Sequence, residues 1–287
     1  MQTQESSMVE SEIKAMVSLL EDDDKDVLKM VEKQIFALGE QAIPYLEDEW
    51  ARQFDPEVQK RIENILQSIN YTVVRNRLLA WANSKDKDLL KGMWIVATYQ
   101  YPDLEIDDLQ KKIEQLYFEA WVNFKPELQA IDQVKLLNSI FFNSFKFKAN
   151  TSNIKAVTNS MINNILETKK SNPIGLCVLY MLIAQKLKMP IYGVNLPNIF
   201  VLTYKTENLQ FYINVFNKGL TFSKHDVDHY IAQLDLTPRA IFYDPCTHLD
   251  IIRRVLRNLI VAYEELGNTE KMEDIQALLD DISNIEA

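Results

Sequence analysis

A scarcity of glycine and proline constrains this fold more than any other feature of the sequence. The chain has six Gly and nine Pro among 287 residues, which is about 5% against about 12% in average proteins. Because these residues supply most tight turns and helix stops, the chain favours long helices over an array of short strands. Its 47% hydrophobic and 25% charged residues are ordinary for a globular protein and exclude a disordered or collagen-like chain.

Helical periodicity dominates residues 9–122. Apolar side chains recur there every three or four residues, as on one buried helix face. Gly39 provides a helix stop, and Asp55 followed by Pro56 provides an N-cap and a first-turn proline. The helices expected after Asp55 are 56–69, 73–82, 86–100 and 106–121. Aromatic residues at helical spacing between 94 and 124 are expected to pack these helices against the rest of the chain.

The pattern changes beyond residue 130. Helices are expected at 131–143, 156–169 and 174–188. Short runs rich in β-branched and aromatic residues follow and predict strands. The expected strands are 190–196, 199–204, 211–216 and 220–222. Ser223 and Asp226 have the spacing of a capping box and predict a helix at 224–234, and the chain is helical again from Thr247. These elements predict a mostly helical α+β fold with a small antiparallel sheet packed on helices.

Several stretches resemble known families. Residues 26–50 resemble a HEAT-type helical pair, and residues 257–279 resemble a tetratricopeptide-type pair. The more specific stretches are 99–104, 138–160, 171–197 and 211–219. In this order they resemble the SirB1-like, transglutaminase-like family. The resemblance implies a helical, HEAT-like region at 1–125, a papain-like α+β core at 126–245 and a tetratricopeptide-like helical pair at 246–287.

The resemblance also implies where catalytic residues would lie. Active members use a Cys at a helix N-terminus, a His on a following strand and an Asp on the next strand. The nucleophile position falls near Pro173 to Gly175, whereas Cys177 lies further into the helix and is expected to face away from its N-terminal end. The His position holds Ile199, and the Asp position holds Asn214. Because isoleucine cannot accept a proton, the site is predicted to be vestigial at Gly175, Cys177, Ile199 and Asn214.

Three functions remain open from the sequence. The favoured one is a non-catalytic protein-interaction or regulatory module with protein partners of unknown identity and no cofactor. The second is a thiol-dependent acyl-transfer enzyme, resembling a protease or amidase, that uses Cys177 with another base. The third is a binder of a peptide or small polar ligand in the vacated cleft, where Asn195, Asn198 and Asn214 would supply amide contacts.

All three histidines and the second cysteine fall within one short window of the sequence. The set is His225, His229, Cys246 and His248. His225 and His229 are four residues apart on an expected helix, which suits metal ligation, but the Cys-x-His spacing is a weak zinc signature. We therefore expect these residues to have surface or helix-capping roles and expect no metal.

Charge is unevenly distributed along the chain. The net charge is −10, with 41 acidic and 31 basic residues, and residues 1–60 and 264–287 are strongly acidic. This balance excludes sequence-independent binding to nucleic acid. Three arginines, Arg253, Arg254 and Arg257, lie on one expected helix. They are expected to be solvated or to pair with the acidic tail, and a patch for an anionic partner is the alternative.

The sequence also bears on cellular location. Residues 1–14 show no basic segment followed by an apolar one, so no signal peptide is expected. No apolar run approaches the length of about 20 residues that a membrane span needs. Two cysteines cannot build a disulfide framework, which favours a reducing compartment and predicts a cytoplasmic protein without membrane contact.

Overall fold

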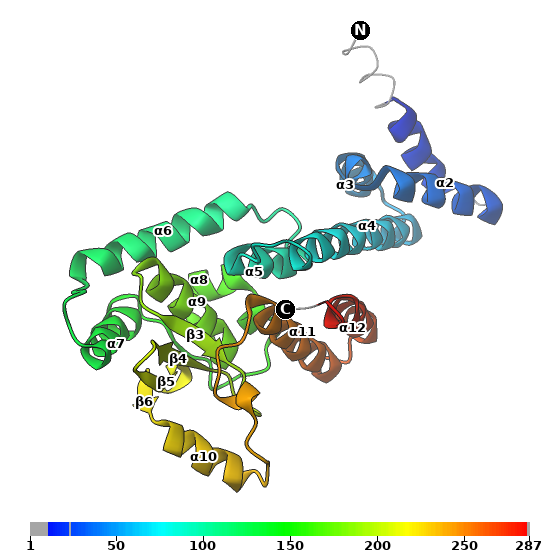
Figure 1. Ribbon diagram of the computed structural model, residues 1–287. Helices are drawn as coiled ribbons and strands as arrows, with labels where there is room; N and C mark the ends of the chain where they lie inside the picture. The colour runs from blue at the N-terminus through cyan, green and yellow to red at the C-terminus, as the bar shows by residue number, and fades with distance from the viewer. Residues whose placement is uncertain (1–10, 23, 286–287) are drawn as a thin grey trace. The chain divides into compact units, whose positions relative to one another are not determined.

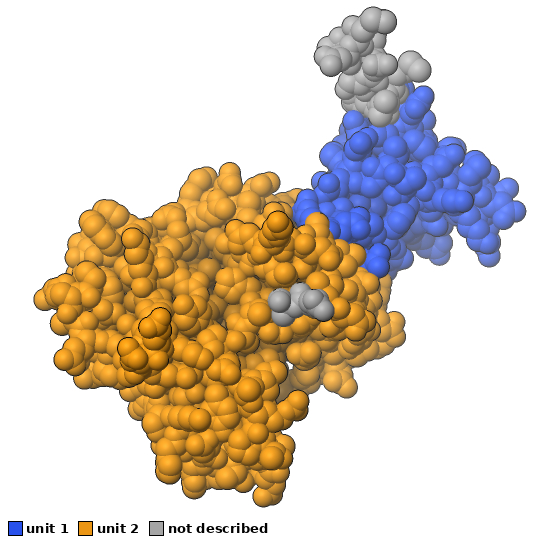
Figure 2. Space-filling model, viewed as in Figure 1, with its two compact units in different colours: residues 1–77 blue, residues 78–287 orange. Residues whose placement is uncertain are grey.

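The computed structural model describes residues 11–22 and 24–285. The chain divides into two compact units, Met1–Arg77 and Leu78–Ala287 (Figure 2), and each is described by itself. The boundaries expected at residues 125 and 245 stay predictions. No described helix is both long enough and apolar enough to cross a membrane.

The first unit is helical throughout its described residues. After a helical stretch at 11–18, its elements are η1 (Leu19–Glu21), α2 (Lys25–Leu38), η2 (Gly39–Ala42), α3 (Ile43–Arg52) and the first part of α4 (Pro56–Ala82). Gly39 ends α2 with φ +58°, as predicted. The apolar faces of these helices share one core that includes Val31, Ile35, Leu46 and Ile62.

Helix α4 corrects one expectation, because it is a single helix where the sequence predicted separate helices at 56–69 and 73–82. No Gly or Pro follows Pro56 within it. The Ser68 and Thr72 hydroxyls each donate a hydrogen bond of 2.9 Å to the carbonyl four residues earlier. Their polar side chains are thereby satisfied inside the helix and do not interrupt it.

The second unit is built around α9 (Pro173–Lys186). Ten of its residues are buried, among them Leu176, Cys177 and Tyr180. The surrounding helices are α5 (Leu89–Thr98), α6 (Ile106–Asn123), α7 (Ala130–Asn138), α8 (Ile162–Thr168), α10 (Lys224–Gln233), α11 (His248–Glu265) and α12 (Thr269–Ser283). Helices α5, α6, α8 and α11 contact α9 directly (Figure 1). A helix enclosed in this way is apolar on every side, because every side faces protein.

A four-stranded antiparallel sheet packs on α9 and confirms the predicted fold class. Its order is β3 (Ile191–Val194), β4 (Val201–Lys205), β5 (Gln210–Asn214) and β6 (Leu220–Phe222). Strands β3 and β4 contact α9, and β5 contacts α10 (Figure 1). The predicted capping box of Ser223 and Asp226 is present at the start of α10.

Three local features were not predicted. A two-stranded parallel sheet joins β1 (Lys148–Ala149) to β2 (Lys170–Ser171), and strands this short carry no periodicity. The expected helix 131–143 is α7 followed by a π-helix at Ser139–Ser144. The expected helix 156–169 is the 3-10 turn η4 (Val157–Ser160) followed by α8.

Candidate functional site

The N-terminal turn of α9 is held by its own side chains. Asn172 is the N-cap, and its Oδ1 accepts a hydrogen bond of 3.0 Å from the Gly175 amide. Pro173 occupies the first turn, where its missing N–H costs no hydrogen bond. Just before the cap, the buried Ser171 hydroxyl donates to the Asn159 carbonyl at 2.6 Å. The start of α9 is thus a rigid feature of the site.

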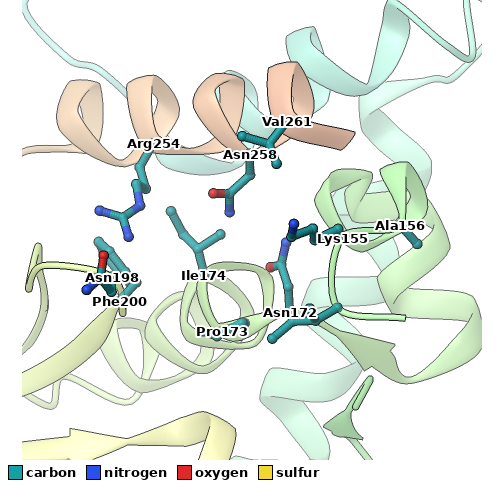
Figure 3. Close-up of a pocket in the computed structure, with 11 residues that line it drawn as sticks. Lys155, Ala156, Asn172, Pro173, Ile174, Asn198, Phe200, Arg254, Asn258 and Val261 are labelled. Atoms are coloured by element: carbon teal, nitrogen blue, oxygen red, sulfur yellow. The ribbon is translucent and has the colours of Figure 1, made fainter. Parts of the chain in front are cut away.

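A pocket of about 230 Å³ lies at this end of α9 (Figure 3). Arg254, Asn258 and Val261 line it from α11, where their spacing of four and three residues places them on one helix face. The opposite wall is the start of α9, and residues 154–156, Asn198 and Phe200 complete the lining. In Figure 3, Arg254 extends toward Asn198, and Ile174 lies between the two helices. The pocket therefore has polar side chains around an apolar floor.

Two cations border the pocket, and they differ in whether a carboxylate pairs with them. The Lys155 ammonium forms an ion pair with Glu265. Arg254 donates from Nη1 to the Asn195 Oδ1 at 3.0 Å and has no ion pair with any described carboxylate. Burial lowers the pKa of Arg254, and the charge of Arg257 lowers it further. The guanidinium is therefore oriented by an amide while its charge remains uncompensated.

The Cys177 thiol lies in the core of the second unit and does not line the pocket. It is fully buried, and its Sγ donates to the Phe200 carbonyl over 3.7 Å. Burial raises the pKa of this thiol far above its ordinary value. No histidine in the described part of the chain is hydrogen-bonded to it. The thiol is therefore enclosed by the core and not open to the pocket at the helix N-terminus.

The neighbouring position, Gly175, has no room for a side chain. A Cβ atom placed there would lie 2.1 Å from the Ser171 Oγ and 2.7 Å from the Asn159 carbonyl oxygen. Both distances are far below van der Waals contact. The local packing that fixes the helix N-terminus therefore also excludes a nucleophile from this position.

The two positions assigned to the base and the orienting acid are structural. Ile199 packs against a buried cluster that includes Val194, Tyr212 and Ile231. Asn214 ends β5, and its Oδ1 accepts from the Asn217 amide at 3.0 Å. Neither residue lines the pocket.

The three candidate amides separate into different roles. Asn198 lines the pocket from a left-handed backbone conformation with φ 62°. Asn195 lies outside the lining and orients Arg254. Asn214 belongs to the sheet, as described above. The structure thus brings only one of the three into the pocket.

The histidine and cysteine set is dispersed over separate local contacts. On α10, the His229 Nε2 lies 3.1 Å from the Gln233 Nε2, and His225 precedes it by one turn. The His248 Nδ1 lies 2.7 Å from the Lys87 carbonyl oxygen. The Cys246 amide donates to the Gly193 carbonyl at 2.8 Å. Within residues 11–22 and 24–285, no three His, Cys, Asp or Glu residues gather in a metal-binding arrangement.

Sequence reasoning missed most of the pocket residues. It grouped Arg253 with Arg254, but Arg253 donates to Asp250 and to the carbonyls of Ile282, Ser283 and Ile285 near the end of α12. Asn172, Lys155 and Asn258 were not predicted as site residues. The sequence does contain one signal of the pocket, because residues 254, 258 and 261 share one helix face. That signal can be recognised only when the start of α9 is known to face them.

Comparison with known proteins gives a family and distant relatives. The profile of the transglutaminase-like superfamily matches residues 107–257. A UPF0162 protein of Xylella fastidiosa is 24% identical over 205 residues, which is 68% of this chain and 70% of that protein. A UPF0162 protein of Buchnera aphidicola is 26% identical over 179 residues, covering 61% of this chain and 64% of that protein.

A second group of relatives comes from animals. Human F-box only protein 21 is 23% identical over 252 residues, covering 76% of this chain but only 39% of that protein. No solved structure matches the chain.

Proposed function

The chain belongs to the transglutaminase-like superfamily, and we propose that it acts as a non-catalytic protein-interaction or regulatory module. The observation that carries the proposal is the burial of Cys177. A thiol reacts as its thiolate, so a catalytic cysteine needs a lowered pKa and a neighbouring base. Cys177 instead has a raised pKa, caused first by burial, and donates its hydrogen bond to the Phe200 carbonyl.

An exposed aromatic surface on α6 supports an interaction role. Phe118, Trp121 and Val122 are 61%, 57% and 61% exposed, although the sequence predicted that aromatic residues here would be packed. The two rings stack with centroids 6.2 Å apart. Large aromatic side chains are the residues that most often anchor protein interfaces. We call Phe118, Trp121 and Val122 the α6 surface.

The relatives add a second line of support. The similarity to human F-box only protein 21 spans 39% of that protein, so the matched region is one part of a longer chain. A region of this kind that occurs within a larger protein suits a module that contacts other proteins. The activity of that larger protein is not assigned to this chain.

Thiol labelling tests the non-catalytic assignment against the acyl-transfer alternative. Native protein is treated with iodoacetamide at neutral pH, and labelled peptides are quantified by mass spectrometry. We expect Cys177 to be labelled only after denaturation, with Cys246→Ser serving to isolate its signal. Fast and selective labelling of Cys177 in the folded chain would contradict the proposal.

Partner capture tests the interaction role with matched variants. The full chain is cross-linked in cells as wild type, Cys177→Ser, Trp121→Ser and Phe54→Ser. Phe54 is 95% exposed and lies outside the α6 surface, so it controls for loss of an exposed ring. We expect Trp121→Ser alone to lose partners. Loss of partners in folded Cys177→Ser would overturn the proposal.

A further inference from the structure

We infer that the pocket between α9 and α11 binds a carboxylate carried on a short apolar body. Arg254 would pair with the carboxylate, and Asn172 and Asn258 would donate hydrogen bonds to further acceptor oxygens of the ligand. This site is separate from the α6 surface, and its ligand binding does not depend on whether that surface binds a protein.

The charge of the pocket selects an anion. None of the described residues that line it is acidic, while Arg254 and Lys155 both border it. Glu265 neutralises Lys155, which leaves the Arg254 guanidinium as the uncompensated charge. A guanidinium presents paired N–H donors that match the two oxygens of a carboxylate. One uncompensated positive charge suits a monoanion better than a doubly charged phosphate.

Asn172 provides a second hydrogen-bond donor at the pocket. Its side chain is 96% buried (4% exposed) and lines the pocket. The cap uses its Oδ1, whereas its Nδ2 has no hydrogen-bond partner among the described residues. Figure 3 shows the Asn172 and Asn258 side chains on facing walls of the pocket. The Nδ2 is not enclosed by the chain, so it stays available to an acceptor oxygen of a molecule in the pocket.

The apolar lining limits the size and character of the ligand. Ile174 lies between Arg254 and Asn172, and Phe200 and Val261 add further hydrocarbon to the lining. A cavity of about 230 Å³ accommodates a short aliphatic acid or the last residue of a peptide with a free C-terminus. Both sources offer the same chemistry, which is a carboxylate on a small apolar group.

An NMR titration of the full chain with butanoate tests the inference. We expect amide shifts at residues 154–156, 172, 174, 198 and 254–258. Binding of the neutral butanamide should be at least about tenfold weaker, because a charge-assisted pair is lost. Arg254→Gln is expected to weaken butanoate binding by a similar factor. Arg257→Gln removes the same charge from an exposed position of α11 and is expected to bind butanoate nearly as wild type.

Asn172→Asp tests the Nδ2 donor without removing the helix cap. The aspartate retains the cap acceptor for the Gly175 amide and replaces the open donor with a negative charge. We expect unchanged thermal stability and loss of butanoate binding by at least about tenfold. Unchanged binding in this folded variant would overturn the role of Asn172.

Further probes identify the source of the carboxylate. Preferential binding of N-acetyl-dialanine over its C-terminal amide would indicate a peptide terminus, and binding of butanoate alone would indicate a small acid. Stronger binding of inorganic phosphate, equal binding of acid and amide, or no shift at the pocket with either acid would overturn the inference. Labelling of Cys177 is read separately, so a failure here does not decide the proposed function.

Discussion

The N-terminal end of α9 and the residues that follow it differ sharply in what they expose. At the first turn, Asn172 and Ile174 border a polar pocket beside Arg254. The residue after Ile174, Gly175, is already closed in by Ser171 and Asn159, and Cys177, at the start of the second turn, is fully buried. A distance of a few residues along one helix separates a surface that can meet a ligand from a core that cannot.

This difference shows why the presence of a cysteine near a helix N-terminus is a poor guide to activity. The favourable field of a helix N-terminus falls off within its first turn. Beyond that turn, desolvation dominates and raises the pKa of the thiol. Whether a cysteine lies inside the first turn or in the buried part beyond it therefore decides how reactive its thiol is. The following predictions test where that boundary lies.

Placing a nucleophile in the Gly175 position is expected to have the largest effect. Gly175→Cys would force Cβ against the Ser171 side chain and the Asn159 backbone, and we expect a loss of about 3 kcal/mol in the free energy of unfolding. Urea denaturation measures it. Gly267→Ala is the control, since Gly267 has φ +67° with no atom near its Cβ position, and should lose about 1 kcal/mol from backbone strain alone. A Gly175→Cys protein as stable as wild type would show that the helix is open at Gly175.

Replacing the buried thiol is expected to have the next largest effect. Cys177→Ser places a more polar group in the core, and we expect a loss of about 2 kcal/mol of stability. The same urea experiment detects this change. Cys246→Ser should cost less, because Cys246 is only partly buried. If both substitutions cost the same, the core around Cys177 is less closed than its burial indicates.

Changing the cap tests the first turn itself. Asn172→Ala removes the acceptor for the Gly175 amide and should cost about 1 kcal/mol. Asn172→Asp keeps an acceptor and should stay within a few tenths of a kcal/mol of wild type. Thermal unfolding of the two variants provides the comparison. Equal loss in both would show that the side-chain acceptor at this position does not stabilise the helix.

Raising the pH is expected to lower the stability of the folded chain through its buried titratable groups. The change in stability should be smallest near neutral pH. Burial, followed by the charge of Asp250, raises the pKa of Cys246 from 9.0 to about 12. The unfolded chain thus loses this proton at lower pH than the folded chain, and stability falls as pH rises from 9 toward 12. Urea midpoints across this range should decline. Cys246→Ser should reduce the slope, with the remainder due to groups such as Tyr263, whose pKa burial raises to about 12. A flat profile in wild type would contradict the burial of these groups.

Much of the fold was predictable from local pattern. The strands near 191–194 and 201–205, the capping box at Ser223 and the helical character of both ends follow from periodicity and turn chemistry, which act over a few residues. The continuous α4 was missed because weak helix formers in its middle are satisfied within the helix. The two-residue strands β1 and β2 were missed because pairing between distant segments leaves no local pattern.

The sequence by itself determined that the positions predicted for the family's base and acid hold Ile199 and Asn214, because the identity of a residue does not depend on packing. Only the tertiary structure decided that Cys177 is enclosed, that Gly175 cannot carry a side chain, and that Arg254 and Asn172 face one pocket. The physical reason is that burial and the pairing of charges arise from segments far apart in the chain. The side of α9 that meets water is set by α11 and the sheet, and not by α9 alone.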